Sequence, residues 1–109
     1  MNATTLKALE ASIRHWERMR DGKRHIMGTG DYKWPEMPVA EHCALCRLFL
    51  IGVEMSDSCV GCPVNDAGHR HCRNTPYEQA HLEHQRNGQS ASFRAAAARE
   101  VEFLRGLLP

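Results

Sequence analysis

The sequence CALC at residues 43–46 is followed, after twelve residues, by CVGCP at residues 59–63. Each Cys-x-x-Cys turn can direct two sulfur atoms at one tetrahedral ion, and two such turns complete its coordination shell. The spacing therefore predicts a metal site with Zn²⁺ as the expected ion. An iron–sulfur cluster is the alternative cofactor, and two buried pairs of apolar thiols are the non-metal alternative. The predicted ligands are Cys43, Cys46, Cys59 and Cys62.

A fifth cysteine, Cys72, follows the second pair by ten residues and lies beside His69 and His71. Cys72 is a possible substitute for Cys59 or Cys62, or a spare thiol packed beside the site. We favour the four paired cysteines, and whether Cys72, His69 or His71 is a ligand stays open at this point. Four thiolates leave no open position for water, which favours a structural ion over a catalytic one.

The composition indicates why a small fold would need such a metal. Leu, Ile, Val and Phe together make up 20 of the 109 residues, which is few for a well-filled core. The formal net charge is only +1, whereas disordered chains usually carry a high net charge. We therefore expect one domain over residues 1–109 that depends on a metal for stability. The same numbers exclude a large enzyme and a strongly basic nucleic-acid binder.

The N-terminal residues and the longest apolar run indicate the cellular compartment in which we expect the protein. The first residues show no basic segment followed by an apolar stretch, so we expect no secretory signal. The longest run of bulky apolar residues covers 48–51, which is too short to span a bilayer. We expect a soluble, cytoplasmic protein that does not enter membranes. In a reducing cytosol, paired cysteines are more often metal ligands than disulfides, and an odd count fits disulfides poorly.

Hydrophobic periodicity predicts a mainly α fold, in which two Cys-x-x-Cys knuckles are packed among about three helices. The first helix covers 4–21, where Leu6, Leu9, Ile13 and Trp16 form one apolar stripe. Glycines and prolines predict a loop over 22–42. The zinc knuckle region follows over 43–72.

Two further helices are predicted after the knuckle region, over 76–86 and 91–107. Thr75 is the expected N-cap of the first, with Pro76 at N1 and Glu78 at N3 completing a capping box. The second carries an apolar stripe at spacings of three and four residues. The residues of that stripe are Phe93, Ala97, Val101, Leu104 and Leu108.

No catalytic constellation stands out, so we expect a protein without enzymatic activity. His81 and Glu83 give the H-x-E of a zinc deaminase, but they follow the cysteines rather than precede them. One basic cluster supports an alternative function as a nucleic-acid-binding zinc module. Trp16 lies within this cluster, but its place on the apolar stripe predicts a core position. The cluster comprises Arg14, Arg18, Arg20, Lys23, Arg24 and His25.

The combined pattern resembles small uncharacterised proteins of tailed bacteriophages and prophages. The resemblance rests on both cysteine pairs, Gly68, Cys72 and the Thr-Pro-Tyr sequence at 75–77, and it extends to His15-Trp16 and to the ending 101–109. It implies a phage-encoded accessory protein, and it places Cys72 within the shared pattern, which favours Cys72 as a ligand. It implies no activity. The function we expect is binding of a host or phage protein.

Overall fold

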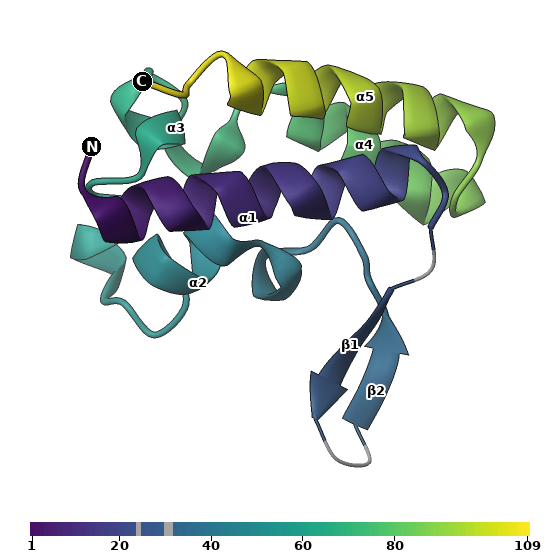
Figure 1. Cartoon of the computed structure of the whole chain (residues 1–109), viewed down its shortest axis with the longest axis horizontal. Coiled ribbons are helices and arrows are strands. Elements are labelled where there is room, and N and C mark those ends of the chain that lie inside the picture. The colour runs from purple at the N-terminus through teal and green to yellow at the C-terminus, as the bar shows by residue number, and fades with distance from the viewer. Residues whose placement is uncertain (24, 30–31) are drawn as a thin grey trace.

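The computed structural model describes residues 1–23, 25–29 and 32–109 of the chain. The chain is mainly helical, which confirms the predicted fold class at that level (Figure 1). Short 3-10 turns, labelled η, connect some of the helices. In chain order the elements are α1 (Ala3–Arg20), β1 (Ile26–Thr29), β2 (Tyr32–Pro35), η1 (Ala40–His42), α2 (Ala44–Phe49), η2 (Met55–Asp57), α3 (Pro63–Asp66), η3 (Arg70–Cys72), α4 (Pro76–Asn87) and α5 (Ala91–Arg105).

Helix α1 forms because its apolar stripe faces the core and both of its ends are capped. The Asn2 side chain accepts a hydrogen bond from the Thr5 backbone N–H at 2.8 Å, which fixes the start. Gly22, with a φ of +70°, lets the chain turn away after Arg20. Leu9 and Met19 are completely buried on this stripe.

Helix α5 runs antiparallel to α1 and packs against both α1 and α4 (Figure 1). Phe93, Ala97 and Val101 on its predicted stripe are completely buried. The helix ends at Arg105, two residues before the predicted end, because glycine at 106 is a poor helix former. Leu108 consequently lies outside the helix and is 40% exposed.

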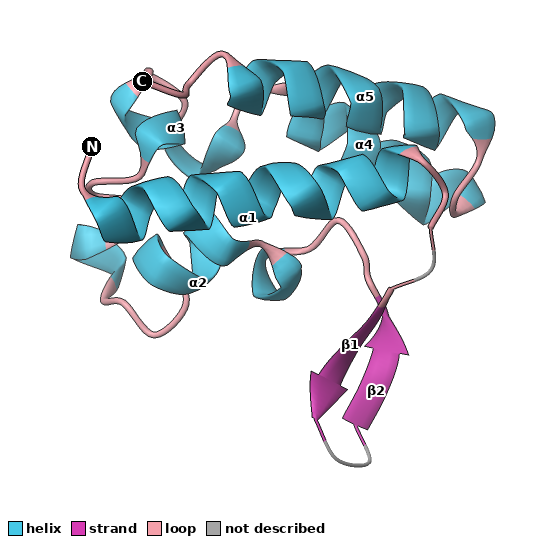
Figure 2. Cartoon of the chain, viewed as in Figure 1, coloured by secondary structure: helices cyan, strands magenta, loops and turns pink. Residues whose placement is uncertain are grey.

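The predicted loop over 22–42 is wrong in part, because this segment contains a two-stranded antiparallel hairpin. Strands β1 and β2 pair in the register Ile26 to Pro35, and the hairpin projects from the helical body (Figure 2). Each strand has four residues, which is too few for alternation to be recognised in the sequence. Of the glycines and prolines that predicted a loop, Gly28 lies within β1 and Pro35 at the end of β2.

The prediction of about three helices counts the long helices and misses the short ones. Helices α1, α4 and α5 lie where the sequence predicts them. The cysteine region contains two further α-helices, α2 with six residues and α3 with four. Such lengths cover between one and two helical turns, which is too little for an amphipathic pattern to repeat, so periodicity does not reveal them. In the part of the chain that the structure describes, no helix is long and apolar enough to cross a bilayer.

A buried ion-pair cluster fastens the segment after the hairpin to α1. The Glu36 carboxylate is 3% exposed and receives both Arg18 Nε, at 2.9 Å, and Arg18 Nη2, at 2.8 Å. His15 Nδ1 contacts the same carboxylate. Burial alone would raise the pKa of Glu36, but the hydrogen bonds from His15 and Arg18 outweigh it and lower the pKa from 4.5 to about 2.

The lowered pKa predicts an acid-sensitive contribution of Glu36 to stability. Its folded-state pKa lies below the unfolded value, so the contribution is complete above about pH 5 and is lost as pH falls toward 2. The shift corresponds to about 3 kcal/mol. Urea unfolding of the wild type and Glu36→Gln, measured from pH 7 to pH 3, should show a difference that shrinks with falling pH. Loss of any bound metal in acid affects both proteins alike. A difference in the free energy of unfolding that does not change with pH would contradict the prediction.

Candidate metal centre

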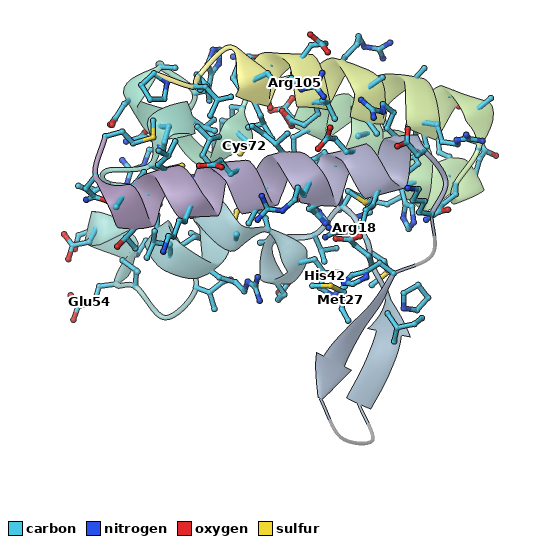
Figure 3. The ribbon with its side chains drawn as sticks, viewed as in Figure 1. Arg18, Met27, His42, Glu54, Cys72 and Arg105 are labelled. Atoms are coloured by element: carbon cyan, nitrogen blue, oxygen red, sulfur yellow. The ribbon has the colours of Figure 1, made fainter. Side chains whose placement is uncertain are left out.

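All five cysteines line a single cavity of about 150 Å³ at the meeting point of the helices. Helix α2 supplies Cys46, η3 supplies Cys72, and the others lie immediately beside α2, η2 and α3. Trp16 of α1, Tyr77 of α4 and Leu104 of α5 form further walls. Figure 3 shows Cys72 between the ribbons of α1 and α5. The residues that the spacing predicts as ligands are therefore brought together with Cys72.

The first cysteine pair is held in place by α1. Cys43 is the N-cap residue of α2, and Cys46 lies within the first turn of that helix. Ser12 of α1 contacts this turn at two points, because its Oγ lies 3.6 Å from Cys43 Sγ and accepts the Leu45 backbone N–H at 3.2 Å. A small polar residue on the buried face of α1 thus positions the first pair.

The second pair forms a tight turn that depends on left-handed backbone conformations. Cys59 and Gly61 have φ values of +65° and +88°, and the Cys62 N–H donates to the Cys59 carbonyl at 3.1 Å. Gly61 adopts this conformation without the steric cost that a Cβ would bring. Cys59 N–H also donates to the Phe49 carbonyl at 2.8 Å, which ties this turn to the end of α2.

Cys72 is positioned by the cap of α4. Thr75 Oγ1 donates to the Cys72 carbonyl at 2.7 Å and accepts the Tyr77 N–H at 3.3 Å. The predicted capping box is only half formed, since the Glu78 carboxylate accepts from the Asn74 N–H rather than from that of Thr75. The cap hydroxyl therefore connects the start of α4 to the cysteine cavity.

Both histidines left open by the sequence also line the cavity. His69 Nδ1 lies 3.0 Å from the Arg73 carbonyl, and His71 Nε2 lies 3.0 Å from Ser58 Oγ. Each imidazole has a second ring nitrogen, so neither of these contacts consumes the whole donor capacity of the ring.

Sequence reasoning missed one functional group, the Glu100 carboxyl on α5. Glu100 lines the cavity and is 3% exposed, and within the described residues its Oε1 has no hydrogen-bond partner. Burial and the nearby Cys43 raise its pKa to about 8. The signal was present in the sequence, because position 100 follows Ala97 by three residues and precedes Leu104 by four, which puts it on the apolar stripe.

The thiols influence one another electrostatically. A hydrogen bond with the Cys46 thiol lowers the pKa of Cys43 to about 6, although burial opposes this change. The same contact raises the pKa of Cys46, and burial raises the pKa values of Cys62 and Cys72. Charge on one sulfur therefore disfavours charge on the others unless a cation compensates it.

The sulfur atoms share a cavity without forming a preassembled site. Over the described ranges, no group of three or more His, Cys, Asp or Glu side chains is arranged so that it could hold a metal ion. None of the five cysteines, all of which are described, forms a disulfide. The metal-stapled part of the predicted fold class thus stays a prediction.

Two arginines of the basic cluster expected at the end of α1 form ion pairs with nearby carboxylates. Arg18 binds Glu36 at 2.8 Å, and Arg20 binds Asp21 at 2.8 Å. Trp16 is 2% exposed, which confirms its expected core position and leaves its ring unable to stack on a base. Arg24 lies outside the described residues.

Comparisons with protein-family models, with curated proteins and with solved structures found no match to this chain.

The second cysteine turn predicts a specific cost for adding a side chain at Gly61. Both Gly61 and Gly52 have a positive φ, which strains any residue with a side chain. A Cβ at position 61 would lie 3.2 Å from Phe49 Cε1, whereas a Cβ at position 52 would meet open space. Gly52→Ala should lower the free energy of unfolding by about 1 kcal/mol through backbone strain alone. Gly61→Ala should lower it further because Phe49 must move, and equal losses in chemical denaturation would contradict this account of the turn.

Proposed function

We propose that the protein is a small, non-enzymatic binding protein, stabilised by zinc, that docks on a host or phage protein in the cytoplasm of the infected cell. The first half of this proposal concerns the ion. Five thiols and one carboxyl around one cavity are donors of the type that Zn²⁺ prefers. Four zinc-bound sulfurs lie about 3.8 Å apart, as tetrahedral geometry with 2.3 Å bonds requires. Binding would therefore draw the two cysteine turns together across the cavity.

The second half concerns the surface on the outer side of the cysteine turns. The observation that carries it is the exposure of large apolar side chains on the segment 48–60, which joins the two pairs and enters the second cysteine turn. Met55 is 88% exposed and Val60 is 62% exposed, and Ile51 and Leu48 are exposed as well. Exposed apolar side chains concentrated in one segment are typical of protein interaction sites.

Charge around this surface favours a partner of a particular kind. Glu54 and Asp57 are exposed within the same segment, and Glu41 and Asp66 flank it, with Arg47 and Arg70 as nearby cations, the latter donating through Nη2 to Ser58 Oγ at 3.3 Å. Complementary potentials steer association, so the partner we propose is a protein with an apolar surface bordered by Lys or Arg. The same acidic groups disfavour contact with phosphates, and together with the paired state of Arg18 and Arg20 they make the nucleic-acid alternative weaker.

The test introduces charge on this surface and at an exposed apolar control position on another helix. Ile51→Asp with Met55→Asp should weaken binding of the partner at least about tenfold, because both apolar contacts are lost. Leu82→Asp on α4, where Leu82 is 39% exposed, should leave binding unchanged. Partners are recovered from host lysate with each variant and their affinities compared by titration, after circular dichroism has shown that the variants fold. The proposal is contradicted if the wild type, the double variant and Leu82→Asp bind the same partner with equal affinity. It is also contradicted if the wild type recovers no specific partner.

A further inference from the structure

Glu100 is a buried carboxyl group that the packing of α5 does not require. Its neighbours on the same face, Ala97, Val101 and Leu104, are apolar and at most 4% exposed. An apolar residue at position 100 would continue this face. A buried polar group without a hydrogen-bond partner costs free energy, so Glu100 makes the metal-free protein less stable than such a residue would.

The position of Glu100 indicates what would compensate this cost. Its Oε1 is buried and unpartnered, and it belongs to the cavity that the five cysteines line. Two cysteines, Cys43 and Cys72, are close enough to interact with its charge. A cation in the cavity would therefore lie within reach of the carboxylate and of the sulfurs at once.

We propose that Glu100 is an oxygen ligand of the ion held by the cysteines and takes the place of one of the four sulfurs, so that the ion has a mixed sulfur and oxygen shell. This inference rests on the zinc site of the proposed function. Zn²⁺ accepts carboxylate oxygens at about 2.0–2.2 Å beside thiolates at about 2.3 Å. On binding, each ligand that still carries a proton, the Glu100 carboxyl included, releases that proton to solvent. Helix α5 is thereby joined directly to the cysteine region.

The test compares Glu100→Gln with Glu102→Gln, a matched change on the same helix at a side chain that is 73% exposed. Zinc content and affinity are measured first, and X-ray absorption spectroscopy of the zinc-loaded proteins then counts the sulfur and oxygen neighbours. We expect oxygen in the first shell of the wild type and of Glu102→Gln, its loss in Glu100→Gln, and at least a tenfold lower zinc affinity of Glu100→Gln.

A second measurement separates a ligand from a residue that serves packing alone. In excess chelator, the free energy of unfolding of Glu100→Gln should equal that of the wild type. In the presence of zinc, it should be lower than that of the wild type. If zinc has only sulfur neighbours in the wild type and the same neighbours in Glu100→Gln, this inference is overturned but the proposed zinc site is not. A wild-type protein that binds no zinc would overturn both.

Discussion

The convergence of the protein's cysteines on one cavity is the constraint on which the rest of the structure depends. The segment 43–72 has little regular structure of its own, since α2 and α3 have six and four residues. Helices this short are not stable in isolation. Their order must come from contacts at the cavity, where Ser12 holds the first pair, the Phe49 carbonyl holds the second, and Thr75 holds Cys72.

The molecule therefore has two kinds of stabilisation. Helices α1, α4 and α5 bury an apolar seam that includes Leu9, Phe93 and Val101, and this seam follows ordinary amphipathic packing. The cysteine region packs against the seam through Leu45, Val64 and its cysteines, and it exposes Met55 and Val60 to solvent. A bound ion would supply to this region the free energy that its own side chains do not, and would at the same time fix the surface that we propose for partner binding.

Much of this arrangement is predictable from the sequence, for physical reasons. The three long helices carry enough turns for a period of 3.6 to be recognised, and Thr75-Pro76 marks a helix start through local chemistry alone. The hairpin and the short helices are not predictable, because four to six residues hold too little periodicity. The grouping of the cysteines is predictable from their spacing. The distances between their sulfurs depend on tertiary contacts, such as that of Ser12, that the spacing does not encode. Glu100 was missed because a lone charged residue in an apolar stripe can be taken for the edge of that stripe.

The central claim is that an ion bound by the cysteines fastens the fold, and removal of the ion tests it most directly. Purified protein is treated with excess chelator at neutral pH, and its far-ultraviolet circular dichroism and melting temperature are compared with those of the zinc-loaded protein. The account predicts a marked loss of helicity and a lower melting temperature, both restored by added Zn²⁺. Unchanged helicity and an unchanged melting temperature would contradict it.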